Sequence, residues 1–165
     1  MLLGTMIALA LAAQSTATPK RPRPSAAQRI AQISRGSCEG TCPIYRVVVY
    51  SDGAVDYEGQ DFVKVVGAVS DYLPPEDVAK LRQAFGDAGY MNLREKYVDG
   101  PSDCEFVDTF YQSGSRSRAI HHYACSDLAP KALSKLEARF EEIVRTYRWV
   151  GTPEERKQLR AAGWP

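Results

Sequence analysis

The sequence contains few of the residues that enzymes commonly use for catalysis or metal binding. It has only two histidines, His121 and His122, and no Gly-x-Ser-x-Gly, phosphate-loop, dinucleotide-binding or His-Glu-x-x-His motif. Adjacent residues of a strand point to opposite faces, so these histidines cannot ligate one metal ion from the same strand. We therefore expect no metal site and no cofactor, and the sequence indicates no catalytic class.

The sequence also lacks an excess of charge of either sign. Its 165 residues include 21 Lys and Arg against 20 Asp and Glu, which gives a formal net charge of +1. Nucleic acids and anionic membranes attract a concentrated positive surface, so this balance disfavours both as partners. Solenoid repeats are absent, and the length and the 44% hydrophobic content suit one domain with a single core.

No apolar run reaches the length of about 20 residues that a bilayer-spanning helix needs. The apolar run at residues 2–12 is uncharged, and it is followed by Ser15 and Ala17, the small residues that a signal peptidase accepts. We predict a signal peptide over residues 1–17 and a periplasmic or secreted mature protein without stable membrane insertion. Residues 18–28 are basic and proline-rich, which predicts a disordered leader.

Cysteine is scarce but even in number, and an even number in an exported protein predicts disulfides. Strands over residues 105–112 and 117–124 flank a predicted type II′ turn at Gly114-Ser115, which sets Ser113 opposite Arg116. The same register sets Cys104 opposite Cys125, with about 4.5 Å between the Cα atoms. This pairing leaves Cys38 to bond with Cys42.

The Cys38-x-x-x-Cys42 pair has two further interpretations, a redox pair and half of a metal site. Catalytic thiol exchange usually uses Cys-x-x-Cys at a helix start, where the helix dipole lowers the pKa of the thiol. Here the spacing is longer, and the following Pro43-Ile44-Tyr45 leads into a strand. The spacing favours a structural bond, with a thiol oxidoreductase as the alternative.

An alternating stretch near residue 50 predicts the first hairpin. Asp52-Gly53 is typical of a two-residue type I′ turn, which sets Tyr50 opposite Val55 and Val48 opposite Tyr57. These four side chains then share one face, which we expect to meet the core. Further strands are predicted over residues 29–35 and 62–69.

Two main helices follow from apolar spacing. Pro74-Pro75-Glu76-Asp77 predicts a helix start, and Gly89 predicts its end. Ser126-Asp127 predicts the cap of the second helix. Its expected apolar stripe is Leu133, Leu136, Phe140, Ile143, Val144 and Tyr147.

The predicted fold class is α+β, with an antiparallel sheet of about five strands built from two hairpins and packed against the two main helices. We expect a single domain over residues 29–150. A Thr-Pro-Glu-Glu capping box at residues 152–155 predicts a short C-terminal helix within the tail 151–165.

Two groups of side chains are candidates for function. The register sets Asp108 opposite His121, a pair that can orient a general base with Ser113, Ser117 or a freed cysteine as nucleophile, although such pairs are usually structural. Aromatic residues on strands are usually core, but the alternative is a surface platform for a partner. The platform would consist of Tyr45, Tyr57 and Tyr111.

The pattern Cys38-x-x-x-Cys42-Pro43-x-Tyr45, followed by a β run, Asp52-Gly53 and Tyr57-Glu58-Gly59, resembles a family of bacterial extracytoplasmic domains of unknown function. The resemblance covers residues 30–144, including a Leu-Pro-Pro-Glu helix start and a late strand that ends in His-Tyr. It implies a small secreted α+β domain, and it supplies no catalytic residues.

We predict an exported, non-catalytic binding or envelope-associated domain. Its expected partner is an envelope protein or a small ligand, bound at an exposed sheet face or edge strand. The alternative is an enzyme, either a thiol oxidoreductase at Cys38 and Cys42 or a hydrolase that uses Asp108 and His121.

Overall fold

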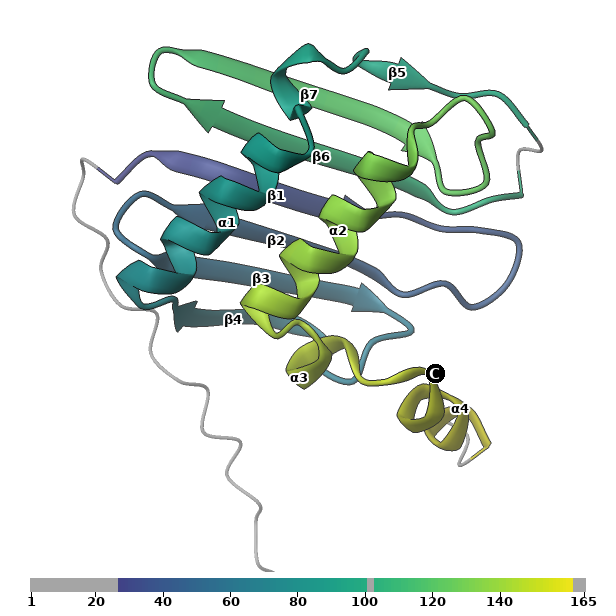
Figure 1. Ribbon diagram of the computed structural model, residues 1–165. Helices are drawn as coiled ribbons and strands as arrows, with labels where there is room; N and C mark the ends of the chain where they lie inside the picture. Colours follow the sequence, from purple (N-terminus) through teal and green to yellow (C-terminus); the bar gives the residue numbers. More distant parts are fainter. Residues whose placement is uncertain (1–26, 101–102, 162–165) are drawn as a thin grey trace, which may run out of the picture.

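One seven-stranded sheet organises the chain, as the computed structural model in Figure 1 shows. The structure describes residues 27–100 and 103–161; the predicted signal peptide and most of the predicted leader lie outside them. The strands are β1 (Arg29–Arg35), β2 (Ile44–Tyr50), β3 (Ala54–Asp61), β4 (Gly67–Tyr72), β5 (Lys96–Tyr97), β6 (Phe106–Ser113) and β7 (Arg116–Tyr123). The helices are α1 (Pro75–Asp87), α2 (Lys131–Val144), α3 (Tyr147–Val150), α4 (Pro153–Ala161) and the 3-10 helix η1 (Tyr90–Asn92).

The strand order is β4-β3-β2-β1-β6-β7-β5, so β1 joins the two hairpins at the centre of the sheet. All neighbours are antiparallel except β5, which pairs with β7 in parallel through two residues. The α+β class is confirmed, but the expected number of about five strands is too small. A two-residue strand such as β5 has no alternation to detect, because its conformation depends on tertiary pairing.

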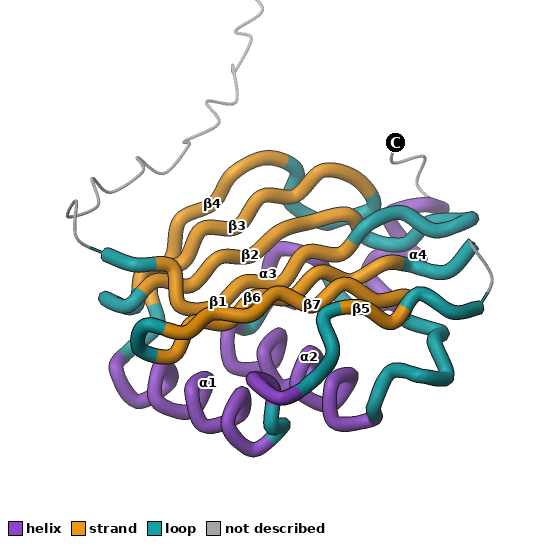
Figure 2. Tube along the Cα trace, turned by 90° about the horizontal axis from the view of Figure 1, so that it is seen from above, coloured by secondary structure: helices purple, strands orange, loops and turns teal. Residues whose placement is uncertain are grey.

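Helices α1 and α2 cover one face of the sheet (Figure 2). The core lies between them and the strands, and its largest fully buried side chains include Tyr57, Tyr90, Phe85, Phe140, Ile33 and Leu81. Alternate strand residues such as Gln32, Asp56 and Asp108 are half-buried and point to the opposite side, called the open face below.

The second hairpin has the predicted register. Ser113 pairs with Arg116, and Asp108 pairs with His121. Gly114 has φ +59°, as the first central residue of a type II′ turn requires. The loop chemistry therefore determines which side chains meet along both strands.

The first hairpin differs from its predicted register by one residue. Val47, rather than Val48, pairs with Tyr57. Gly53 has φ +87°, but Asp52 is not among the residues with positive φ, and the Asp52 side chain accepts a hydrogen bond from the Ala54 N–H at 3.0 Å. A type I′ turn needs positive φ at both positions, so the loop lengthens and the core face of β2 carries Tyr45, Val47 and Val49 instead.

The predicted strand over residues 62–69 begins later, at Gly67, because residues 62–65 form bends. The bends bring the backbone N–H groups of Lys64 and Val65 to the carbonyl groups of Val150 and Trp149, at 3.2 and 2.8 Å. This segment therefore pairs with the C-terminal part of the chain rather than with β3.

Two of the three predicted helix starts are confirmed. Helix α1 begins at Pro75, as predicted. Helix α4 has the predicted capping box, with the Thr152 N–H donating to Glu155 at 2.8 Å and the Glu155 N–H donating to the Thr152 hydroxyl at 3.2 Å. The predicted cap of α2 at Ser126-Asp127 is wrong, because Ser126 donates to Asp99 and α2 begins at Lys131.

Substitution by alanine is expected to change the free energy of unfolding in opposite directions at two glycines. A Cβ atom at Gly59 would lie 2.2 Å from the Val65 carbonyl oxygen and 2.3 Å from the Tyr57 hydroxyl, whereas one at Gly86 in α1 would meet nothing within 4 Å. We expect Gly59→Ala to lower the free energy of unfolding by about 1–3 kcal/mol. Gly86→Ala should raise it by about 0.5–1 kcal/mol. Urea unfolding of both variants checks the pair, and equal effects would contradict the packing described here.

Candidate functional site

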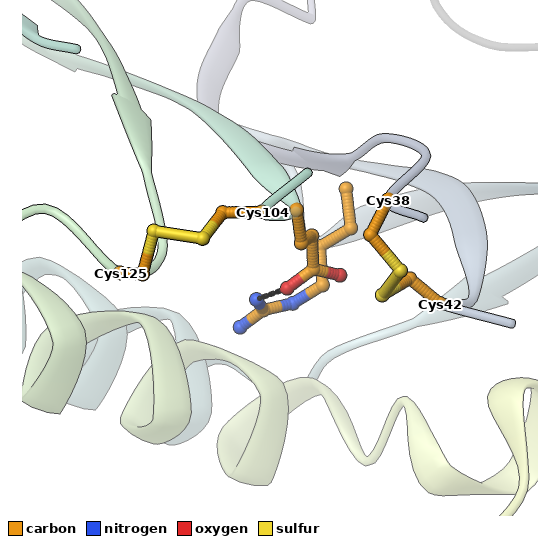
Figure 3. Close-up of a disulfide and its surroundings, with 6 residues drawn as sticks. Cys38, Cys42, Cys104 and Cys125 are labelled. Atoms are coloured by element: carbon orange, nitrogen blue, oxygen red, sulfur yellow. Dashed lines mark hydrogen bonds and ion pairs between the residues drawn. A yellow bond between two sulfur atoms is a disulfide. The ribbon is translucent and has the colours of Figure 1, made fainter. Parts of the chain in front are cut away.

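Two disulfides lie at one end of the sheet (Figure 3). Cys38 bonds Cys42 in the β1–β2 loop, and Cys104 bonds Cys125 across the ends of β6 and β7. Both predicted bonds are present, but the Cα atoms of Cys104 and Cys125 are 6.1 Å apart rather than the expected 4.5 Å, because the bond lies beyond the ends of the paired strands. A hydrogen bond of 3.0 Å from the Glu39 N–H to the Asp103 carbonyl joins the two loops.

The strand register places a row of side chains next to these disulfides, on the face that α2 covers. Arg35 of β1 pairs with Tyr45 of β2 on one side and with Val107 of β6 on the other. Val107 in turn pairs with His122 of β7. Polar residues thus occupy part of the core face at this end of the sheet.

Helix α2 supplies the partner of Arg35 and Tyr45. Glu141 accepts hydrogen bonds from the Arg35 Nε, at 2.6 Å, and from the Tyr45 hydroxyl. Arg35 also donates to Glu105, at 2.8 Å. These four residues, called the Arg35 cluster below, join β1, β2, α2 and the start of β6.

The electrostatics of the Arg35 cluster follow from its burial. Burial lowers the pKa of Arg35, but the charges of Glu141, Tyr45 and Glu105 and the hydrogen bond to Glu141 together outweigh this effect and raise the pKa, so the guanidinium stays charged. Burial, together with the charge of Glu141, raises the pKa of the Tyr45 hydroxyl well above its usual value. Burial also raises the pKa of Glu105, although Arg35 opposes this shift. The cluster holds two carboxylates and one permanent cation.

A second buried pair lies beside the cluster. The Nε2 atom of His122 lies 2.6 Å from Glu137, and its Nδ1 atom lies 2.9 Å from the Tyr123 carbonyl oxygen. The Tyr123 carbonyl oxygen can only accept, so Nδ1 donates; with Glu137 ionised, Nε2 donates as well and the imidazole is in its protonated form. The side chains of His122 and Glu137 are only 3% and 4% exposed. This arrangement is a buried ion pair.

This ion pair predicts a pH dependence of stability. Burial lowers the pKa of His122, but Glu137 outweighs it through a hydrogen bond and its charge, so the pKa is raised above 6.5. A raised folded-state pKa contributes stability that is complete below the unfolded pKa and is lost as the pH rises through the folded value. We expect the free energy of unfolding to fall as the pH rises above 6.5.

Urea unfolding at a series of pH values measures this effect. The fall should be much smaller in Glu137→Gln, which cannot hold the imidazolium by charge. Parallel pH profiles for the two proteins would contradict the ion pair.

A groove borders the Arg35 cluster. It has a volume of about 500 Å³ and runs between the disulfide loop and the chain from the end of α2 to α4. Arg35, Tyr45, Glu105 and Glu141 contribute to its lining. The remaining lining residues are Cys42, Pro43, Glu142, Thr146, Tyr147, Val150, Gly151, Thr152, Pro153 and Arg156. Its volume lies in the range of about 300–1,000 Å³ that is common for ligand sites.

The sequence predicted Tyr147 on the buried stripe of α2, but it lies in α3 and is 55% exposed. Helix α2 ends at Val144, and the following residue, Arg145, has φ +60° and turns the chain away from the helix axis. The turn is the reason that Tyr147 reaches the groove rather than the core.

Asp108 and His121 form the predicted cross-strand pair, with 2.8 Å between Oδ1 and Nδ1, on the open face. Their side chains are 45% and 38% exposed. The proposed nucleophile Ser117 lies four residues from His121 along β7, about 13 Å away. Neither Asp108 nor His121 lines the groove beside the Arg35 cluster or either of two other hollows among the described residues. The geometry is that of an ordinary surface pair.

The three tyrosines of the alternative surface platform occupy core positions. Tyr45, Tyr57 and Tyr111 are 3%, 1% and 6% exposed, so their rings do not form an exposed platform. Tyr57 packs against Trp149, with ring centroids 5.0 Å apart, and Tyr111 stacks on Phe85 at 4.1 Å. The one-residue shift of the first hairpin contributed to this placement, because it turned Tyr45 to the core face.

The sequence interpretation missed two acidic residues of α2, the buried Glu137 and the half-buried Glu141. Glu137 lies between Leu133 and Phe140 on the apolar stripe of α2, where an ionisable residue needs a buried partner. Glu141 lies one turn further along the same helix. The position of Glu137 within the apolar stripe of α2 was the available signal for a buried polar contact. The partners Arg35 and His122 could not be identified from it, because they come from distant strands.

Within residues 27–100 and 103–161, no group of three or more His, Cys, Asp or Glu side chains is placed to hold a metal ion. In the same part of the chain, no helix combines the length and apolar character needed to cross a membrane.

Comparison with protein families places the chain in one family. Residues 29–144 match the model described as Domain of unknown function (DUF6438). No curated protein matches the sequence. The match covers most of the chain, including the strands β1 to β7 and helices α1 and α2 that carry the Arg35 cluster and the His122–Glu137 pair. The protein therefore belongs to the family Domain of unknown function (DUF6438).

Proposed function

We propose that this protein is an exported, periplasmic or secreted domain that binds a ligand in the groove beside the Arg35 cluster and does not act as a catalyst. The observation that carries the proposal is a groove of about 500 Å³ with half-buried charged side chains in its lining. The expected site, a sheet face or an edge strand, is replaced by this groove.

The energetics of the Arg35 cluster support a binding role. Arg35 and Glu105 have side chains that are only 17% and 15% exposed. Taking such groups out of water costs more free energy than burying apolar residues of similar size, so an ion pair here is weak support for stability alone. Polar groups held in fixed positions next to a hollow are what a ligand site requires.

The disulfides support both the compartment and the site. Two disulfides and no free cysteine among the described residues are typical of an oxidising environment outside the cytoplasm. The Cys38–Cys42 bond also closes the loop that connects Arg35 to Tyr45, which fixes the shape of one groove wall. Pre-organisation of this kind lowers the entropic cost of binding.

Two measurements test the proposal. Cell fractionation should recover the protein outside the cytoplasm with all four cysteines resistant to alkylation before reduction.

Screening of a small-molecule library by nuclear magnetic resonance should reveal compounds that shift the amide signals of Tyr45, Glu141 and Thr146. A cytoplasmic protein with free thiols would contradict export, and a library with no hit at these amides would contradict binding in the groove.

The oxidoreductase remains a second candidate because Cys38 and Cys42 are both partly exposed and Cys42 lines the groove. A structural disulfide has a reduction potential below about −300 mV, whereas catalytic pairs lie higher. Equilibration with glutathione and dithiothreitol buffers measures the potential. A value in the catalytic range would replace the binding proposal with thiol exchange.

A further inference from the structure

The Arg35 cluster contributes two carboxylates but only one guanidinium to the lining of the groove. Glu141 and Glu105 share the single guanidinium of Arg35, at 2.6 and 2.8 Å. Each carboxylate uses one oxygen, and among the described residues no hydrogen bond reaches the other oxygen of either group. The only side-chain atoms of the described residues that are both fully buried and unpaired are the Nε atoms of Arg118 and Arg156. These two carboxylate oxygens are therefore accessible and can meet a ligand.

The other charged residues of the groove are Glu142 and Arg156. The Glu142 side chain is 68% exposed and accepts from Arg139 at 2.6 Å. Arg156 donates to the Gly151 carbonyl oxygen at 2.7 Å, while its Nε atom is buried without a hydrogen-bond partner among the described residues. The lining therefore carries three carboxylates against two guanidinium groups, and this excess favours a positively charged ligand.

The outer wall is suited to the body of an organic cation. Tyr147 is 55% exposed and lines the groove together with Pro43 and Pro153. An exposed aromatic ring attracts an ammonium or guanidinium group through its negative face. Proline rings and aromatic rings also pack well against methylene groups.

We propose that the groove binds an organic cation, with an ammonium or guanidinium group against the carboxylate oxygens of Glu141 and Glu105 that Arg35 does not use, and its carbon chain against Tyr147. The inference rests on the proposed function, because it names the ligand class of the same groove. A bound cation would balance the excess of carboxylates in the lining. The group can come from a free polyamine or from a lysine or arginine side chain of a peptide.

Titration of the full-length protein tests the inference by nuclear magnetic resonance. The probes are spermidine, N-acetyl-arginine amide, and acetate as an anion of similar concentration. Both cations should shift the amide signals of Arg35, Tyr45 and Glu141, and acetate should not. Tighter binding of spermidine would identify a polyamine-like ligand, and tighter binding of the arginine derivative would identify a peptide side chain.

Three variants separate this site from general attraction of cations. Glu141→Gln should weaken binding about tenfold, because a hydrogen bond to a charged group is lost. Tyr147→Ala should weaken it roughly two- to fivefold without loss of folding, since the ring is exposed. Glu95→Gln is the matched control, because Glu95 is 75% exposed and does not line the groove, and it should bind within twofold of the wild type. Far-ultraviolet circular dichroism confirms that each variant is folded.

The outcomes distinguish the inference from the proposed function. If uncharged or anionic compounds from the library bind in the groove while both cations fail, the ligand class is wrong and the binding function stands. If nothing binds there, both are wrong. Equal losses in Glu141→Gln and Glu95→Gln would also overturn the inference, because they would indicate unspecific attraction of cations to surface carboxylates.

Discussion

Replacement of Glu137 by alanine is expected to lower the free energy of unfolding by about 3–5 kcal/mol at pH 6, the usual cost of leaving a buried charge without its partner. His122 is 3% exposed, and its Nε2 atom donates to Glu137 at 2.6 Å. Alanine would remove the acceptor and leave a cavity beside an imidazole that water cannot reach. Urea unfolding measures the loss.

The same helix provides the control. Glu142 is 68% exposed, and Glu142→Ala should change the free energy of unfolding by no more than about 0.5 kcal/mol. The double variant His122→Leu/Glu137→Leu should recover much of the loss, because apolar residues of similar size often replace a buried ion pair without destabilisation. A loss below about 1 kcal/mol for Glu137→Ala would contradict the buried ion pair.

Removal of the Cys104–Cys125 bond should destabilise the protein more than removal of Cys38–Cys42. The bonds span sequence separations of 21 and 4 residues. In the chain-entropy description the free energy depends on loop length, which gives about 3 kcal/mol for the longer loop and about 2 kcal/mol for the shorter one. Paired Cys→Ala variants, unfolded in urea without reductant, measure both losses.

The two bonds should also differ in their effect on the groove. Cys42 lines it, whereas Cys104 and Cys125 do not. Loss of Cys38–Cys42 is therefore expected to weaken ligand binding, and loss of Cys104–Cys125 to leave it nearly unchanged in the folded protein. The reverse order of stability, or equal effects on binding, would contradict the assignment of one bond to the fold and the other to the site.

The sequence predicted those parts of the fold that depend on local chemistry. The Gly114 turn determined the second hairpin and hence the Cys104–Cys125 bond, and the Thr152–Glu155 capping box began α4. The predicted register of the first hairpin was wrong because two turn types compete at Asp52-Gly53. Asp52 stabilises a longer loop through its own side chain, and the difference of one residue exchanged the faces of β2.

The site was less predictable because it is assembled from distant segments. Arg35 and Glu141 are 106 residues apart in sequence, and their contact depends on how α2 crosses the sheet. The histidine that forms a buried pair is His122, although the sequence pointed to His121. Local spacing placed His121 opposite Asp108 correctly, but only tertiary packing shows which of the two faces α2 covers.

The most direct test of the account is a crystallographic fragment screen of the oxidised protein. Fragments should collect in the groove between the Cys38–Cys42 loop and Tyr147, with basic fragments within hydrogen-bond distance of Glu141 or Glu105. Fragments that leave this groove empty and gather instead on the open face of the sheet or between α1 and α2 would contradict it.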